Sequence, residues 1–577
     1  MTNNILKKTL VVLWWMTCLF LTIDTGLFLY PSLSQTLLGG TCTLLTCTTI
    51  MIYGIVYKGK WPTNKGILLV MSWGVYIVFH SCFVENAEHY KMYYILTSLT
   101  LLLSLSFALH NDYISQRQIE NGLLFMTVLQ IACMILQLVG IKESNNPNFT
   151  CTGFGTNPNT VCILFAVLIP TMANRFSHSR HIYAGLLVIL ASVIFVLSMG
   201  CRTAIIGFLT IVLIRMLHSN RIQKWIKKKP SRIYLCAFTI LACIIFLSTT
   251  LYQFKKESAD GRMLIWRIST DMITEKPLGW GVGMFEKNYN LCQGLFFKNS
   301  HGTEKERYLA DIVRMAYNDY LEQGVETGIM GMLFIIVFYT SIIISLRKQQ
   351  NKKELSVVCA FAVMSLVNFI YSAIQPWHVL IAFGAFAFHK SKHSHGIATN
   401  ITMSAICITA CCIKKPQNYN TTTAQIELKS IQTQYNCKPP INIVKGLEKH
   451  IDSSGEYYMF LADVYKQNQD YESAICALEK AAEYTSDTRI FFEMFNCYDK
   501  LGKTDKGICY IQTISNILPQ NMTSRNILLR WYDSIGKYDE ALKIANEMVE
   551  TKLKVQNPTA LQYQKGAQYY INNFNHK

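Results

Sequence analysis

Long runs of apolar residues, separated by short polar segments, fill the first 413 positions of the chain. A helix needs about 20 mainly apolar residues to cross the hydrocarbon of a bilayer, and most of these runs reach that length. Lys and Arg gather in alternate connecting segments, most densely at residues 221–232, and this bias marks cytoplasmic loops. The pattern therefore predicts an all-α polytopic bundle of about 13 spans whose N terminus is cytoplasmic.

The predicted spans are listed here in chain order. The first five lie near residues 9–30, 36–56, 66–84, 92–109 and 122–140. The sixth starts near 161, the seventh lies near 182–199, the eighth starts at 203, and the ninth and tenth lie near 233–252 and 329–346. The eleventh and twelfth form a hairpin that turns at Gln375, Pro376 and Trp377, and the thirteenth lies near 397–413.

One long polar stretch, residues 253–328, interrupts this pattern between two predicted spans. Counting spans places it on the outer side of the membrane, and it contains Arg262, Arg267 and Arg314 beside a Pro/Gly-rich turn at 277–283. Long loops between ordered elements are more often functional than connective. The alternative interpretation is an ordered cap without chemistry.

The C-terminal residues change in character and repeat themselves. Tyr465, Tyr498 and Tyr532 recur at an interval of about 34 residues, and small residues recur with them at Ala474, Gly507 and Ala541. This is the tetratricopeptide period, in which helix pairs stack to bury a shared core. We predict a membrane domain at 1–413, a linker at 414–455 and a soluble, α-helical, tetratricopeptide-like domain at 456–577, which lies outside if the last predicted span crosses. It is either a stabilising appendage or a docking surface for a protein partner that tunes acceptor choice.

Composition agrees with a membrane protein, because 51% of the residues are hydrophobic and 16% are charged. The formal net charge of +18 comes from basic residues in short loops, so it reports orientation and not a nucleic-acid partner. The 19 cysteines form no CxxC pair and no zinc spacing, so no metal is expected. Cys151 and Cys292 both lie outside, and whether they pair is left open.

Arginines on the outer side form the candidate chemistry. Arg202 follows one span and precedes the small residues of the next, and an arginine there is often only snorkelling. Arg262 and Arg267 lie on the same predicted side, however, so several guanidinium groups could converge on one anionic ligand. A lipid-linked pyrophosphate suits them, because paired arginine contacts stabilise charge on a phosphate leaving group without a metal.

Four segments then resemble the O-antigen ligase and polymerase superfamily, in the same order. They are GFGTNPNTVCILFAVLIP, GCRTAIIGFL, GR..IW......I...PLGWGVGMF and YNDYLEQGVETGIMG, and the resemblance covers about residues 149–388. It implies a metal-independent glycosyltransferase of the bacterial inner membrane, without a cofactor. Such an enzyme transfers a glycan from undecaprenyl pyrophosphate to an acceptor glycolipid or protein at the periplasmic face. Arg202 and Arg262 match arginines that contact the donor pyrophosphate, and Arg267 is expected to assist them.

Tyr317 stands where the family has a histidine proposed to activate the acceptor, while Asn318, Gly328 and Gly331 match the family pattern. A tyrosine with the usual pKa of about 10 is a poor base at neutral pH. Either a carboxylate takes the proton, with Asp319 the first candidate, or Tyr317 only positions the acceptor, or the pyrophosphate leaves with little help. Asp319 is equally expected to cap a helix. The other candidate carboxylates are Asp311, Glu322 and Glu326.

Tyr289, Gln293 and Asn318 are predicted to contact the glycan or the acceptor, since such side chains hold sugars by stacking and hydrogen bonds. Tyr289 and Gln293 serve equally well to pack the loop. Two other functions stay open: protein O-oligosaccharyl transfer, in which the repeats recruit the acceptor polypeptide, and transport of a lipid-linked oligosaccharide. Transporters usually show repeated spans with buried mid-membrane charges. Here the spans show no clear internal repeat, Asp24 is the main charge within them, and the polar residues collect in the outer loops.

Overall fold

The computed structural model describes residues 2–84, 87–176, 182–219, 222–224, 253, 256–391, 393–395, 418–434, 439–451, 454–554 and 557–574. The spans predicted at 233–252 and 397–413 lie outside these ranges. The chain forms two compact units. The membrane unit comprises Met1–Leu251 and Tyr317–Lys429, and the loop-and-tail unit comprises Tyr252–Ala316 and Ser430–Lys577. Most of the polar outer loop therefore folds with the C-terminal tail.

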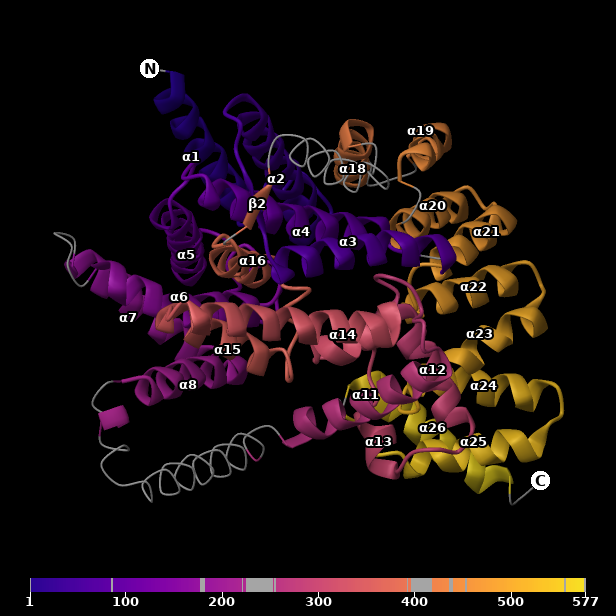
Figure 1. Cartoon of the computed structure of the whole chain (residues 1–577). Helices are drawn as coiled ribbons and strands as arrows, with labels where there is room; N and C mark the ends of the chain where they lie inside the picture. Colours follow the sequence, from indigo (N-terminus) through magenta and orange to yellow (C-terminus); the bar gives the residue numbers. More distant parts are fainter. Residues whose placement is uncertain are drawn as a thin grey trace. The chain divides into compact units, whose positions relative to one another are not determined.

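The described part of the membrane unit is built almost entirely of helices (Figure 1). They are α1 (Thr2–Phe20), α2 (Pro31–Val56), α3 (Lys65–Phe83), α4 (His89–His110), α5 (Gln116–Leu138), α6 (Pro158–Phe176), α7 (Ile182–Ser198), α8 (Arg202–Leu217), α14 (Asp319–Lys348), α15 (Lys352–Met364) and α16 (Ile374–Phe388). The exception to the all-α prediction is a short antiparallel pair, β1 (Trp61–Thr63) with β2 (His393–His395).

Six of the described helices are long and apolar enough to cross a membrane, namely α2, α3, α4, α5, α6 and α14. The shorter helices α7 and α16 are also apolar. By helix length and composition this is a multi-pass membrane protein. The described residues thus support a multi-pass bundle, and the count of about 13 spans stays a prediction.

Helices α4 and α16 form the core of the membrane unit. Every residue of α16 is buried, and so is every residue of α4 from Met92 to Leu109. The Trp377 indole on α16 donates a hydrogen bond of 2.8 Å to the Ser98 hydroxyl on α4, and α2, α3, α6 and α14 pack around this pair (Figure 1). By contrast, α3 and α7 expose large apolar side chains such as Phe79 and Leu187, as lipid-facing helices do.

The predicted hairpin turn at Gln375, Pro376 and Trp377 is wrong. These residues form the first turn of α16, where a proline costs little because the first amides of a helix have no partner within it. The connection between α15 and α16 is instead the segment 365–373, and most of its residues are buried.

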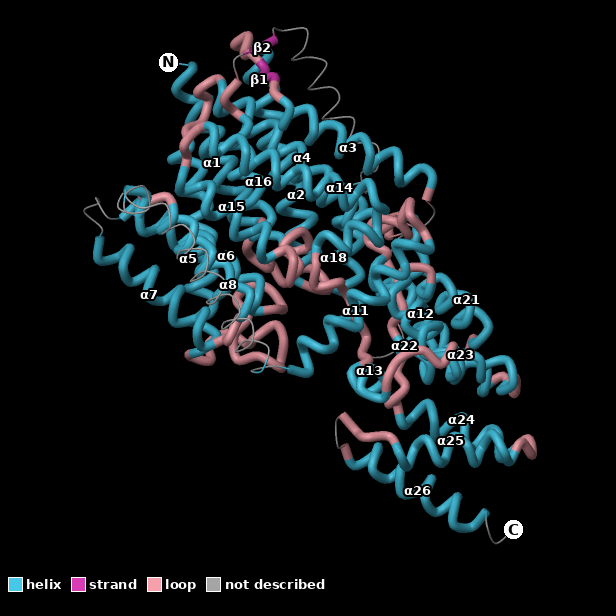
Figure 2. The backbone as a smooth tube through the Cα atoms, turned by 60° about the horizontal axis from the view of Figure 1, so that its bottom comes forward, coloured by secondary structure: helices cyan, strands magenta, loops and turns pink. Residues whose placement is uncertain are grey.

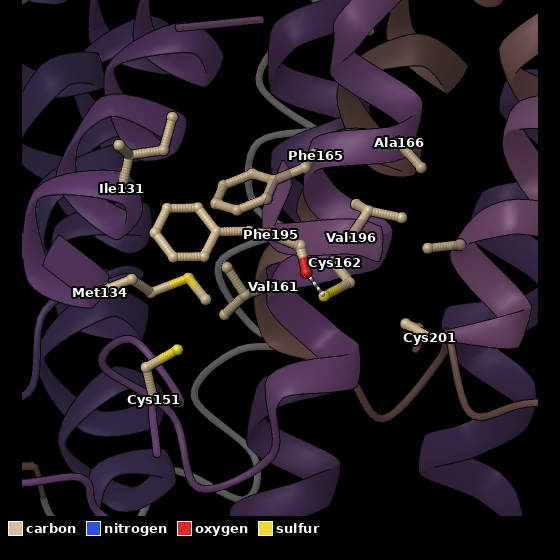
Figure 3. Packing of buried hydrophobic residues seen from close by; sticks show 11 residues of the cluster. Ile131, Met134, Cys151, Val161, Cys162, Phe165, Ala166, Phe195, Val196 and Cys201 are labelled. Atoms are coloured by element: carbon tan, nitrogen blue, oxygen red, sulfur yellow. Dashed lines mark hydrogen bonds between the residues drawn. The ribbon is translucent and has the colours of Figure 1, made fainter. Parts of the chain in front are cut away.

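Helices α5, α6, α7 and α8 enclose an apolar cluster of buried residues that includes three of the cysteines (Figure 3). Cys151, Cys162 and Cys201 contribute thiols to it as small apolar groups, in the same cluster as Phe165 and Phe195. Cys151 carries a free thiol, as does Cys292 in the loop-and-tail unit.

The loop-and-tail unit is also helical (Figure 2). Its helices are α11 (Lys256–Glu275), α12 (Phe285–Lys298), α13 (Glu304–Leu309), α19 (Ile441–Gly446), a 3-10 turn (Leu447–Lys449), α20 (Gly455–Gln467), α21 (Tyr471–Ala482), α22 (Thr488–Lys500), α23 (Thr504–Ile517), α24 (Met522–Ser534), α25 (Tyr538–Glu550) and α26 (Pro558–Phe574). Helix α18 (Asn418–Gln434) crosses the boundary between the units.

Helices α20 to α25 pack as three successive pairs, and each pair contacts the next. The first helices of the pairs begin at Gly455, Thr488 and Met522, so they repeat at about 34 residues, as the sequence predicts. Ala474 and Ala541 are fully buried, and a Cβ at Gly507 would lie 3.0 Å from the Cβ of Tyr498. The C-terminal region is thus helical, and its assignment to the tetratricopeptide class stays a prediction.

Candidate functional site

The largely buried connection between α15 and α16, residues 365–373, joins several of the predicted site segments, and we call it the bridging turn. The Ser365 carbonyl accepts a hydrogen bond of 2.9 Å from the amide of Asp319. In return, the Asp319 carboxylate accepts the amide of Ile370 at 3.0 Å and that of Tyr371 at 3.2 Å. Asp319 is fully buried, so its carboxylate fixes the start of α14 against this turn.

The bridging turn also holds the start of α8, where Arg202 lies. The Asn368 side-chain amide donates a hydrogen bond of 2.9 Å to the hydroxyl of Thr203, and both residues are buried. Arg202 is the first residue of α8 and is half-buried. Two segments that are far apart in the sequence, one with Arg202 and the other with Tyr317, therefore attach to the same turn.

Tyr317 has an unusual backbone conformation immediately before α14. Its φ of 51° lies in the left-handed region, which costs a non-glycine residue on the order of 1–3 kcal/mol. Its half-buried ring packs edge-on against Phe369 of the bridging turn, with centroids 5.8 Å apart. The bonds of Asp319 hold the next part of the chain in place, so the surroundings impose this conformation. Strained residues of this kind are concentrated at functional sites.

The motif that follows Tyr317 has a local structural explanation. The Asn318 side chain caps α14 by accepting the amides of Tyr320 and Leu321 at 3.0 and 3.1 Å. Helix α14 begins at Asp319, inside the predicted loop, and is broken at Gly328, which has a φ of 72° and directly precedes the span predicted at 329.

The break in α14 frees the carbonyl of Thr327, and the Tyr76 hydroxyl donates to that carbonyl at 2.6 Å. Any side chain at Gly331 would collide with the hydroxyl of Thr327. The two glycines of the motif therefore serve the break, one through its dihedral angles and the other through its lack of a Cβ.

A buried ionic cluster that the sequence interpretation missed lies on the first part of α14. Lys91 on α4 binds Glu322 at 3.1 Å and Glu326 at 2.6 Å. The Ser372 hydroxyl of the bridging turn donates to Glu322 at 2.9 Å. The only signal in the sequence is a lysine at the edge of an apolar run, for which snorkelling is the usual explanation.

Every carboxylate predicted as a proton acceptor has a partner in the structure. Asp319 binds the bridging turn, Glu322 and Glu326 bind Lys91, and the exposed Asp311 pairs with Lys554 at 2.8 Å. The expectation that Asp319 caps a helix is wrong, because Asn318 caps α14. Burial of Asp319 and its bonds to the bridging turn still favour a structural role, and the identity of the base stays a prediction.

The other two predicted arginines lie on α11 of the loop-and-tail unit. Arg267 has a side chain that is 56% exposed, pairs with Glu306 at 3.3 Å and lies over the ring of Phe296. Arg262 is half-buried one turn before Trp266, whose indole donates to the Ala316 carbonyl at 3.1 Å. Helix α11 is thereby attached to the residue that ends the loop.

Tyr289 and Gln293, the predicted glycan contacts, are buried on α12. The Tyr289 hydroxyl donates to Gln293 at 3.2 Å, and burial raises the pKa of Tyr289 well above its usual value. The Gln293 amide donates to the carbonyls of Asp311 and Ile517 at 3.1 and 3.0 Å. These bonds favour the packing role for both residues, and the glycan role stays a prediction.

A comparison with protein families gives one match. It begins on α6, extends over α11 to α13, and ends within α14, so it contains Arg202, Arg262 and Tyr317. No curated protein matches the chain. The matched segment lies inside the 149–388 stretch on which the sequence resemblance rests. Residues 165–336 of this membrane protein match the family described as O-antigen ligase.

Proposed function

We propose that this protein transfers a glycan from an undecaprenyl-pyrophosphate-linked donor to an acceptor at the periplasmic face of the bacterial inner membrane. The observation that carries the proposal is that the Arg202 and Tyr317 segments, which both lie inside the O-antigen ligase match, attach to one bridging turn. O-antigen ligases act on lipid-linked glycans, so the family match suggests the same class of substrate here.

In this proposal Arg202 and Arg262, assisted by Arg267, hold the donor pyrophosphate. Guanidinium groups keep their charge and bind phosphate oxygens in pairs, so they stabilise the negative charge that grows on the departing pyrophosphate. The acceptor oxygen forms its bond to the anomeric carbon while the bond from that carbon to the pyrophosphate oxygen breaks. Because pyrophosphate leaves readily, the acceptor hydroxyl gives up its proton late, to a carboxylate or to the departing pyrophosphate itself, and Tyr317 orients the acceptor without serving as the base.

Hydrogen bonds between the loop and the tail support the proposed topology. Lys287 on α12 donates to the Glu483 carbonyl at 2.8 Å, and Gln520 in the tail donates to the Ala310 carbonyl at 2.6 Å. Segments in direct contact lie on one side of a bilayer. If the loop is periplasmic, as the basic loops predict, the tail is periplasmic as well.

The test measures glycan transfer in vesicles that contain a lipid-linked donor. Arg202→Lys and Arg262→Lys are expected to lose most of the activity, because a lysine cannot reproduce paired contacts with phosphate. Arg347→Lys, at the opposite end of α14 from Tyr317, is the matched control and should keep its activity. Near-normal transfer by both site variants would refute the arginine roles.

Glycan profiles of cells with and without the protein separate the candidate functions. A ligase, a polymerase and a protein O-oligosaccharyltransferase leave different unfinished glycans when they are missing. A lipid-linked oligosaccharide transporter would instead leave its substrate on the cytoplasmic side, and that result would contradict transfer.

A further inference from the structure

Three turns of the tail offer hydrogen-bonding groups to the loop at a regular interval. Ser486, Gln520 and Lys554 follow one another at the repeat period of about 34 residues. They occupy the turns from α21 to α22, from α23 to α24 and from α25 to α26. Their partners in the loop are Asn290 at 2.9 Å, the Ala310 carbonyl at 2.6 Å and Asp311 at 2.8 Å.

A second pair of contacts has the same spacing. The carbonyls of Glu483 and Ile517, which are separated by the same period, accept the side chains of Lys287 and Gln293 at 2.8 and 3.0 Å. Since stacked helix pairs place equivalent residues in a row, the turns form one edge. We call this edge, made by residues 483–486, 517–520 and 554, the repeat edge.

Helix α12 packs on α23 with little space between them. A Cβ at Gly294 would lie 3.1 Å from Cγ1 of Ile517 and 3.4 Å from its amide nitrogen. A larger side chain at this position would therefore push the two helices apart. Gly566 on α26 has no atom within 4 Å of the same built position, so it provides a helical glycine without this constraint.

The amides that bind the tail also hold the loop together. Asn290 donates to the Val313 carbonyl at 3.1 Å and accepts the Val313 amide at 2.9 Å, while its bond to Ser486 reaches the tail. Gln293 likewise joins Asp311 to Ile517. Without the tail, these buried donors would lose partners and the loop would lose much of its packed surface.

We propose that the repeat edge is the binding surface for the chain's own loop and that the tail keeps α11, α12 and α13 folded. The partner of this edge is then the segment Tyr252–Ala316. The sequence alone allows either a stabilising appendage or a docking surface for a separate protein that tunes acceptor choice. A second part of this proposal rests on the proposed function: by keeping α11 folded, the tail also presents Arg262 and Arg267 to the donor. Asn290, Gln293 and Ser486 are positioning residues in this arrangement.

Hydrogen exchange of the full-length protein in detergent tests the scaffold directly. Two variants disrupt the interface, one on each side. Gly294→Leu changes the loop, and the triple variant Ser486→Ala, Gln520→Ala and Lys554→Ala changes the tail. Both should speed the exchange of α12 amides by about tenfold or more, which corresponds to about 1.4 kcal/mol. Amides of α4 in the membrane unit should exchange as in the parent.

The controls match these variants in chemistry. Gly566→Leu places leucine at an unconstrained helical glycine, and Ser534→Ala, Gln568→Ala and Lys565→Ala remove the same three residue types elsewhere in the tail. Neither control should change the exchange of α12. Unchanged α12 exchange in both interface variants overturns the scaffold. Should Gly294→Leu also speed exchange in α4, the triple variant alone decides.

Binding of undecaprenyl pyrophosphate in vesicles is the second measurement. Weaker binding in the variants with faster α12 exchange supports both the scaffold and the arginine role. Unchanged binding despite faster exchange leaves the scaffold in place and refutes the donor-binding role of Arg262 and Arg267. The two proposals can therefore fail separately.

Discussion

Asn368 and Thr203, which are 165 residues apart in the chain, meet through a buried hydrogen bond of 2.9 Å. Thr203 follows Arg202 directly, so this bond sets where the arginine begins its helix. Thr203→Val keeps the shape of the side chain and strands the Asn368 amide, at a cost of about 1–3 kcal/mol. We expect glycan transfer to fall roughly tenfold with little loss of folded protein, as measured in vesicles. Thr203→Ser keeps the hydroxyl and should restore transfer, and equal activity of both variants would contradict this role.

Two variants of Asp319 distinguish a structural role of its carboxylate from a catalytic one. Asp319→Asn keeps an acceptor for the amides of Ile370 and Tyr371, whereas Asp319→Ala leaves both amides without one. We therefore expect the alanine variant to lower the unfolding temperature much more than the asparagine variant, since buried unpaired donors cost about 1–3 kcal/mol each. Asp319→Asn should leave the shape of the pH–rate profile unchanged. A profile that loses its acidic limb in this variant would identify Asp319 as the base.

Lys91 neutralises two buried carboxylates, so Lys91→Met should be among the most damaging single changes. Removing one partner from a buried ionic group typically costs about 3–5 kcal/mol. Adding Glu322→Gln and Glu326→Gln removes the stranded charges, and the triple variant should regain much of the lost thermal stability. Absence of any recovery would show that packing, and not charge, is what Lys91 supplies.

Tyr317 combines backbone strain with a proposed role in orienting the acceptor. Tyr317→Gly relieves the left-handed φ and should stabilise that turn slightly, by about 1 kcal/mol at most, while transfer falls. Tyr317→Phe removes only the hydroxyl, and a modest loss of rate is expected. A true acid or base contributes roughly 10²- to 10⁴-fold, so a loss of that size in Tyr317→Phe would restore tyrosine as the proton-transfer group.

We expect Glu286 to make the stability of the loop-and-tail unit depend on pH. Burial raises the pKa of Glu286, against the opposing effects of nearby Arg314 and the hydroxyl of Thr485, while Glu456 and Asp487 add to the increase. The charged form therefore opposes folding. Its penalty is absent below the unfolded pKa of about 4.3 and grows as pH rises through the folded value.

Glu286→Gln should accordingly raise the unfolding temperature of the loop-and-tail unit at pH 8 and leave it almost unchanged near pH 4. Calorimetry at both pH values measures the difference, with Glu472→Gln as an exposed control. Stabilisation of the same size at both pH values would show that the effect of the substitution does not come from the ionisation of Glu286.

Local patterns in the sequence predict the helices well, because an apolar run or a repeated small residue determines structure over one or two turns. The predicted spans at α2 to α6 and the period of α20, α22 and α24 follow in this way. The bridging turn does not, because its bonds to Thr203 and Asp319 join segments that no local pattern connects. The predicted turn at Pro376 is wrong because a proline fits both a turn and the first turn of a helix, and the residue alone does not show which of the two is present.

Lys91 and the loop illustrate a related limit of local patterns. A charged residue beside an apolar run resembles an interface anchor until its partners on another helix are known. Tyr289 and Gln293 have the chemistry of sugar contacts, but the same groups also form buried hydrogen bonds. The carbonyls that Gln293 reaches, those of Asp311 and Ile517, belong to segments that no local pattern connects with it.

The regular spacing of Ser486, Gln520 and Lys554 links the length of the loop to the number of helix pairs. Inserting one pair would move each later attachment point by a whole step, and the loop could follow only by gaining residues between the groups that attach it. Gains and losses of repeats in related chains should therefore be accompanied by insertions or deletions between α12 and α14. The number of helix pairs in the tail would thus limit the lengths that the outer loop can adopt during evolution.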